Sequence, residues 1–196
     1  MERESEARSA ARIRRFRKMA SRAVAPARRL LATCGNPDGG RLGYVASADG
    51  TALFRCVEGG ALDGETVTAA AAGGAFTLAL TAGAGSVISF GDNSRGQLGH
   101  SPGLASSSTP LEALVPEEVV AVAAGDWHAL ALGASGGVWA WGCNRSGQCG
   151  LGPDAVGTDQ PVPRLVPGLA GSWWEGRGGG SGPPPPRIVA LAAGAA

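Results

Sequence analysis

The sequence predicts an all-β protein built from β-propeller blades, and a repeat with a period near 50 residues is the first reason. Residues 86–100 (SVISFGDNSRGQLGH) realign with residues 137–151 (GVWAWGCNRSGQCGL) at an offset of 51 positions. The second reason is that short apolar runs bounded by glycine recur in each copy, which is typical of strands joined by tight turns. The third is the content of 33 glycines and 13 prolines in 196 residues, which favours turns over long helices.

The copies follow one another along most of the chain. Residues 34–43 keep the spacing of Gly91 to Gly99, so they begin a decayed copy, and residues 187–194 (RIVALAAG) resemble residues 119–125 (VVAVAAG). The expected order is a basic leader (1–33), the decayed copy (34–66), a full copy (67–118), a second full copy with an insertion at 171–186 (119–186), and the start of another (187–196). A fixed period of this length indicates a repeat architecture.

The best copy contains four short apolar runs that read as strands. They are expected at residues 119–124, 128–132, 138–141 and 163–167. The last run is flanked by prolines, which suits a strand at the edge of a sheet. Four strands in about 50 residues correspond to one blade of a propeller.

The glycine-rich turn between the third and fourth strands is interpreted as architecture. The aromatic residues Phe90 and Trp141 can fill space between blades, and the glycine after each permits a backbone angle denied to other residues. Asn93 and Asn144 can bond their own turn, and the turn glutamine can pair main-chain groups with both ends of its amide. The structural residues of the repeat are expected to be Gly73, Phe90, Gly91, Gly96, Gln97, Gly99, Gly125, His128, Trp141, Gly142, Gly147, Gln148 and Gly150.

Residues 123–132 (AAGDWHALAL), followed by residues 138–152 (VWAWGCNRSGQCGLG), resemble the repeat of the regulator of chromosome condensation family. The resemblance covers residues 30–196 and is strongest over 67–171. It implies a β-propeller, which this family builds with seven blades. The family includes the nucleotide exchange factor for the small GTPase Ran, a plant ultraviolet-B photoreceptor, and mitochondrial members linked in plants to transcript splicing.

The resemblance also allows a test of light sensing. The photoreceptor uses a tryptophan and an arginine just ahead of the repeat's histidine. Here Asp126 and Trp127 precede His128, and the earlier copy has Phe76 in the place of the histidine. Because no tryptophan cluster can be assembled from these residues, light sensing is not expected.

The sequence offers no group of residues that would form an enzyme's active site, so no catalytic activity, cofactor or metal is expected. His128 has no neighbouring Cys, Ser or second His and is read as structural. Asp92, Asp126 and Asp154 fall in different turns, which gives paired-carboxylate chemistry no support. The four cysteines form no Cys-x-x-Cys pair and are expected to be free thiols, with Cys149 taking the apolar place of Leu98.

The charge is divided unevenly along the chain. Residues 1–29 hold ten of the 17 Lys and Arg against three acids, and the remainder carries seven basic and 13 acidic residues. Residues 7–33 are acid-free, Arg-rich and amphipathic, which is typical of a mitochondrial presequence, and Met19 offers a second start. A nuclear localisation cluster at residues 12–18 and a basic arm without an address are the alternatives.

The predicted function is a non-enzymatic protein-interaction scaffold, mitochondrial rather than nuclear or cytoplasmic. The resemblance implies an alternative, guanine-nucleotide exchange on a small GTPase. Trp173 and Trp174 in the insertion (GSWWEGRGGGSGPPPP) are candidate partner anchors, although they could instead fold back onto the propeller. No membrane span is expected, and no direct nucleic-acid binding, because the basic residues of the body form no stripe.

The number of copies raises a question about closure of the ring. Two full copies, a decayed one and the start of another are too few for seven blades, and an unclosed propeller leaves strand edges open. The sequence is therefore expected to be a shortened product, or to complete its propeller with another chain.

Overall fold

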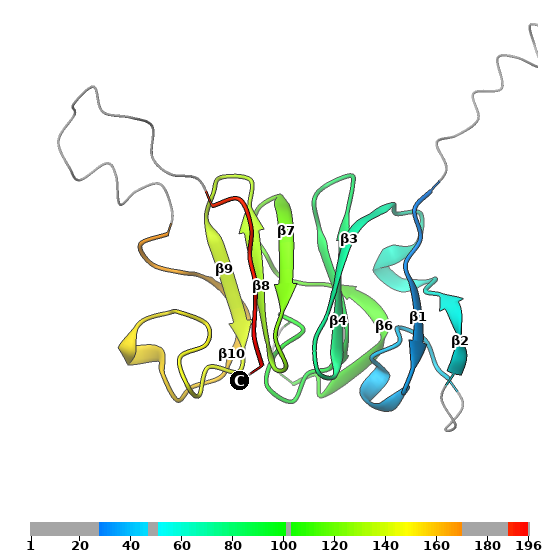
Figure 1. Ribbon diagram of the computed structural model, residues 1–196, viewed down its shortest axis with the longest axis horizontal. Helices are drawn as coiled ribbons and strands as arrows, with labels where there is room; N and C mark the ends of the chain where they lie inside the picture. The colour runs from blue at the N-terminus through cyan, green and yellow to red at the C-terminus, as the bar shows by residue number, and fades with distance from the viewer. Residues whose placement is uncertain (1–27, 47–50, 101–102, 170–187, 196) are drawn as a thin grey trace, which may run out of the picture.

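The computed structural model describes residues 28–46, 51–100, 103–169 and 188–195, and it confirms an all-β fold of propeller blades (Figure 1). The strands are β1 (Ala32–Gly35), β2 (Thr51–Cys56), β3 (Val67–Ala72), β4 (Phe76–Thr81), β5 (Val87–Asp92), β6 (Ser106–Glu112), β7 (Val119–Ala124), β8 (His128–Gly133), β9 (Val138–Gly142) and β10 (Gln160–Leu165). Three short 3-10 helices, η1 (Asp38–Gly40), η2 (Gly60–Leu62) and η3 (Pro153–Ala155), lie in the connections.

The strands form two four-stranded antiparallel sheets and one two-stranded sheet. The first blade has the order β3-β4-β5-β6, the second has β7-β8-β9-β10, and β1 pairs with β2. The two blades stand side by side in Figure 1, and β7 contacts both β3 and β4 across the junction. Within each sheet, strands that follow one another in the sequence are neighbours, because each is joined to the next by a turn or loop.

The first three strands of the second blade lie within one residue of their expected positions, but the fourth does not. It was expected over residues 163–167 and instead spans Gln160–Leu165. Its register against β9 shifts between Gln160 and Arg164. Pro161 and Pro163 fall in this irregular stretch of an edge strand, where a missing N–H removes no ladder hydrogen bond.

The folded body overlaps the segment expected to be a leader, since β1 includes Ala32 and Thr33. The backbone before it also belongs to the folded body. The carbonyl of Leu31 accepts a hydrogen bond from the Val57 N–H at 2.8 Å, and that of Arg29 accepts one from the Val67 N–H at 2.9 Å. Leu31 packs against a buried apolar cluster, which explains why this part of the chain folds with the blades.

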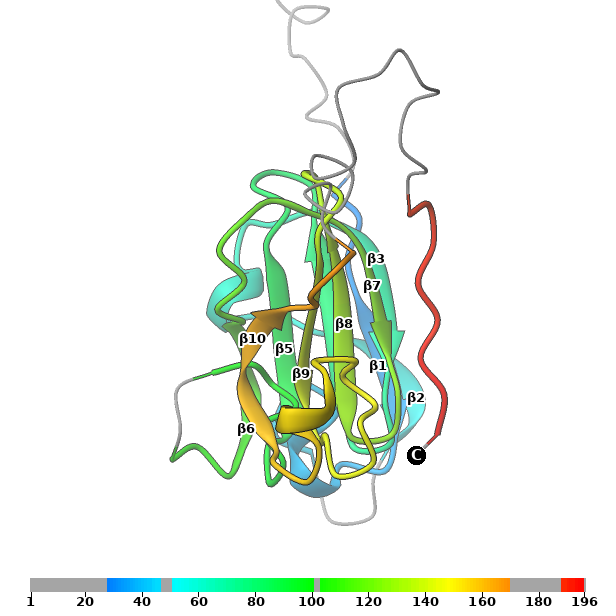
Figure 2. The ribbon, with the colours of Figure 1, turned by 90° about the vertical axis from the view of Figure 1, so that its left-hand side faces the viewer.

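Buried apolar side chains form three clusters: one between the two-stranded sheet and the first blade, one between the two blades, and one between the second blade and residues 188–195. The first contains Val57, Leu62, Ala79, Ile88 and Phe90; the second contains Phe76, Leu78, Leu98, Ala129 and Trp141, among others; the third contains Leu132, Val138, Ala140, Cys149 and Val166. Residues 188–195 lie against the second blade (red in Figures 1 and 2), where Ile188 and Leu191 pack on the third cluster. Each blade is therefore held mainly by its contact with a neighbour.

Candidate interaction surface

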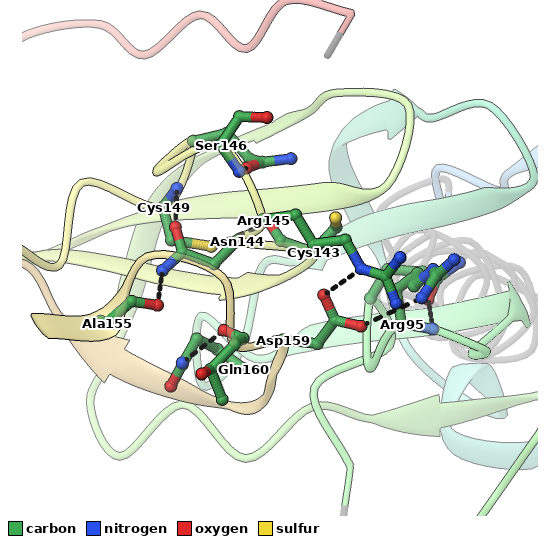
Figure 3. Close-up of polar contacts among 12 residues, drawn as sticks. Arg95, Cys143, Asn144, Arg145, Ser146, Cys149, Ala155, Asp159 and Gln160 are labelled. Carbon is green, nitrogen blue, oxygen red and sulfur yellow. Dashed lines mark hydrogen bonds and ion pairs between the residues drawn. The ribbon is translucent and has the colours of Figure 1, made fainter. Parts of the chain in front are cut away.

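The loop after the third strand is organised by one asparagine in each blade. Asn93 accepts a hydrogen bond from the Leu98 N–H at 2.9 Å and donates one to the Leu104 carbonyl at 2.7 Å. Asn144 accepts from the Cys149 N–H at 3.0 Å and donates to the Ala155 carbonyl at 2.7 Å (Figure 3). The prediction that these side chains bond their own turn is confirmed.

The glutamine of the loop bonds only partly as expected. Gln97 is fully buried, and its Oε1 accepts from the Arg95 N–H at 2.8 Å. Its Nε2 donates to the Asp92 carboxylate at 2.8 Å, so the expectation that both ends pair with main-chain groups is wrong. In the second blade, Gln148 Oε1 accepts from the Ser146 N–H at 2.9 Å in the same way.

The aromatic residue at the end of each third strand fills space between neighbouring sheets, as predicted. Trp141 packs in the cluster that contains Phe76 of the first blade, and its Nε1 donates to the Gln97 carbonyl at 2.9 Å. Its ring lies so close to Gly99 that a Cβ there would stand 2.9 Å from Nε1. In the same way, a Cβ on Gly43 would stand 2.9 Å from Cε2 of Phe90, at the junction one blade earlier.

A second repeated contact joins the blades through the glycine that follows the first strand of each blade. A Cβ on Gly73 would collide with the ring of Phe76 and would stand 2.7 Å from the carbonyl oxygen of Gly125. A Cβ on Gly125 would collide with the ring of His128 and would stand 2.5 Å from the carbonyl oxygen of Gly194. Only glycine fits at these two positions, because side chain and backbone meet there from two sides.

His128 therefore occupies the place that a phenylalanine fills in the first blade. Only 4% of its surface is exposed, and its Nδ1 has no hydrogen-bond partner within the described ranges. Burial lowers the pKa of His128, and the negative charge of Asp126 opposes this shift. A neutral ring packed at a junction agrees with the structural role expected from the sequence.

An ion-pair cluster at the loop end of the blades was not predicted from the sequence. Asp159 pairs through Oδ2 with Arg95 of the first blade at 3.4 Å and through Oδ1 with Arg145 at 3.7 Å (Figure 3). Oδ1 makes no hydrogen bond, so the second pair is purely electrostatic. Such partly exposed pairs each contribute at most about 1 kcal/mol, so the cluster mainly presents charge at a surface.

The other candidate groups are either buried or lie outside the described residues. Cys149 is buried in the apolar place predicted for it, and burial is the main cause that raises its pKa to about 12. Trp173 and Trp174 fall in the part of the chain that the structure does not describe, so their role stays a prediction. The residues described contain no cluster of metal-ligating side chains and no helix that is both long and apolar enough to span a membrane.

Two family models, both for the regulator of chromosome condensation (RCC1) repeat, match the sequence. One matches residues 67–97 and 119–148, and the other matches residues 84–132 and 135–195. The second model covers more than half of the chain. Its first match runs from the third strand of the first blade to the second strand of the next, so one unit of sequence spans two blades.

Similarity to curated proteins extends over only part of their length. RCC1 domain-containing protein 1 of Mus musculus is 41% identical over 93 residues, which make up 46% of this chain and 24% of that protein. Ultraviolet-B receptor UVR8 of Arabidopsis thaliana is 30% identical over 145 residues, which make up 72% of this chain and 31% of that protein. The chain thus spans about a quarter to a third of the length of these relatives.

Prp20p from Saccharomyces cerevisiae is similar in structure. It superposes with a TM-score of 0.62 at 21% sequence identity, over 70% of this chain and 34% of that one. That crystal structure is described together with the binding of Prp20p to Gsp1p and histones. At this level of identity the likeness shows a shared fold.

Proposed function

Because the chain belongs to the family of the regulator of chromosome condensation (RCC1) repeat, we propose that it is a non-enzymatic scaffold that binds a protein partner. The observation that carries the proposal is how the repeat uses its polar side chains. Hydrogen bonds within their own loops already occupy the side chains of Asn93, Asn144 and Gln97. These residues shape the loop end of the blades, and binding is left to the surface side chains around them.

We place this scaffold in mitochondria, with the leader as its address. The acid-free, Arg-rich segment 7–33 supports import, and the body behind residue 29 carries a net charge of −6, from seven basic and 13 acidic residues. Cleavage just before Arg28 would keep the hydrogen bond that the Arg28 guanidinium donates to the Glu65 carbonyl. The partner is proposed to dock on a blade face together with Trp173 and Trp174, and RNA would be contacted only indirectly.

Place and partner can be tested in one experiment with the full chain fused to a biotin ligase. We expect the wild-type fusion to label mitochondrial matrix proteins. Replacing Arg14, Arg15 and Arg22 with glutamine should move the labelling out of mitochondria, because import depends on the cationic face of the leader. Arg28 is left in place because it contacts Glu65.

The same fusion carrying Trp173→Ala and Trp174→Ala provides the test of the partner anchor. It should stay in mitochondria and lose a specific subset of labelled proteins, since tryptophan is enriched among the residues that dominate binding energy at interfaces. Unchanged labelling by this variant would contradict the anchor. Wild-type labelling of nuclear proteins would instead make residues 12–18 a nuclear address.

Exchange activity on a small GTPase is the second candidate, and the shared fold with Prp20p is what favours it. We expect the purified chain to leave the rate of labelled-GDP release unchanged across a panel of small GTPases. The insertion at 171–186, a segment long enough to act as a wedge, carries Glu175 as its lone acid. Acceleration of release by tenfold or more for any one GTPase would replace the scaffold with an exchange factor.

A further inference from the structure

The decayed copy contributes a third and a fourth strand, and its internal contacts identify them. Thr33 on β1 donates to the Leu42 carbonyl at 2.7 Å, just as Ser89 on β5 donates to the Leu98 carbonyl at 2.7 Å. Gly43 meets Phe90 in the way that Gly99 meets Trp141. Strand β1 therefore stands where β5 and β9 stand in the two blades, and β2 stands in the place of β6 and β10.

Among the described residues, β1 has only one of the two neighbouring strands that β5 and β9 have. In the blades, β5 lies between β4 and β6, and β9 lies between β8 and β10. Within the described ranges β1 pairs with β2 alone, and most of its residues are exposed, whereas β5 is almost entirely buried. A strand with one unpaired edge offers its N–H and C=O groups to another chain.

A cavity of about 330 Å³ lies beside this edge. Its walls include Thr33 and Cys34 of β1 and Phe54 of β2 on one side, and Gly73, Phe76 and Thr77 of the first blade on the other. Arg41 also lines it, and its guanidinium donates to the carbonyls of Asp38 and Gly74, which holds the side chain against the backbone. Apart from this one cation, the lining side chains are uncharged, so the walls suit a largely apolar segment.

We propose that the free edge of β1 and this cavity bind a β-strand from another chain, added antiparallel as part of a hairpin. The occupant is a strand of the type aromatic or histidine, small residue, Leu, Ala, Leu. That chemistry is what the molecule itself places there twice, as β4 (FTLALT) on β5 and β8 (HALALG) on β9. The proposal rests on the scaffold role for its premise that a protein is bound, and it adds the edge of β1 as a second docking place.

The register of the added strand follows from the two blades. Phe76 stands opposite Gly91 and Thr77 opposite Phe90, and His128 and Ala129 stand opposite Gly142 and Trp141 in the same way. Carried over to β1, the aromatic residue faces Gly35 and the residue after it faces Cys34. Opposed Cα atoms in antiparallel strands lie about 4.5–5.5 Å apart, which a disulfide can span. Cys34 can therefore report the register.

The test uses the full chain with Cys56→Ala, which leaves Cys34 as its one exposed thiol, since Cys143 and Cys149 are buried. The probe is a synthetic peptide of residues 67–81 with Thr77→Cys, supplied as its 2-pyridyl disulfide. The Cys34 thiolate attacks the peptide sulfur, the peptide–Cys34 disulfide forms, and pyridine-2-thione leaves and is measured by absorbance. The control peptide carries Leu78→Cys instead, so its sulfur points to the opposite face.

We expect the first peptide to react at a rate that saturates with its concentration and is at least about tenfold faster than the control, because binding raises the effective concentration of the thiol. Adding Leu80→Lys to the reactive peptide should abolish saturation. Equal rates for both peptides, or rates linear in concentration, would overturn the proposal. So would a Cys34 that reacts far more slowly than Cys56 in the wild-type chain, because residues of the same chain would then cover the edge. All components are purified, so these outcomes are independent of mitochondrial labelling.

Discussion

Replacing Trp141 with alanine is expected to lower the free energy of unfolding by about 4–6 kcal/mol. The side chain is fully buried between the two blades, so its removal leaves a large cavity. It also leaves the carbonyl of Gln97 without the indole N–H that it accepts at 2.9 Å. Because whole domains are stable by only about 5–15 kcal/mol, this loss should be visible as a large drop in the urea midpoint.

Two matched variants separate the causes. Trp141→Phe restores a ring like that of Phe90 but not the N–H, and it should cost about 1–2 kcal/mol. Trp139→Ala removes a tryptophan from the same strand that is only partly buried and donates to Glu117. Trp139 packs on the margin of the same cluster, so a cost for Trp139→Ala as large as that for Trp141→Ala would contradict the view that the full burial of Trp141 sets the size of its contribution.

Replacing Gly142 with alanine should cost at least about 3 kcal/mol, since backbone strain and overpacking add. Gly142 has a φ of +98°, a conformation that residues with a Cβ rarely adopt. The new Cβ would also stand 2.5 Å from the carbonyl oxygen of Trp127 and 2.9 Å from the Cα of His128. Both are main-chain atoms, which cannot rotate away. Thermal unfolding monitored by calorimetry gives the measurement.

Gly136→Ala is the control for the backbone angle alone. Gly136 has a φ of +90°, but a Cβ there would meet no atom within 4 Å. Its replacement should cost about 1 kcal/mol, the strain of the left-handed conformation without the clash. If the two alanine variants unfold at the same temperature, the close approach of the Trp127 carbonyl contributes nothing.

The sequence predicts most of the fold because each structural position of the repeat occurs in two full copies, which can be compared. Phe90 and Trp141 end matching strands, and Asn93 and Asn144 follow them, so an interpretation of one copy could be checked against the other. Cys149 in the place of Leu98 showed in the same way that the position is buried and apolar. Short-range rules suffice where a motif satisfies its own backbone.

The remaining features depend on contacts between residues that no repeat pairs. The Asp92 carboxylate accepts a hydrogen bond from the Gln97 amide. The second copy has Cys143 in the place of Asp92, so comparing the copies does not reveal this bond. Asp159 joins Arg95 across 64 positions, and nothing local signals that pair. The start of β1 was missed because Arg28 and Arg29 are typical of a cationic leader. The contacts that fold this segment are main-chain hydrogen bonds from the N–H groups of Val57 and Val67, which the sequence does not signal.

The contact of Gly73 with Phe76 and the Gly125 carbonyl recurs as that of Gly125 with His128 and the Gly194 carbonyl. The two units therefore contact the segment that follows them in the same way. A gene segment encoding about 51 residues could be duplicated from any starting point in the unit, and both halves of each contact would be copied together. Lengthening by whole units preserves all junctions. The insertion at 171–186 falls between units, after β10 and before residues 188–195, so it interrupts neither blade.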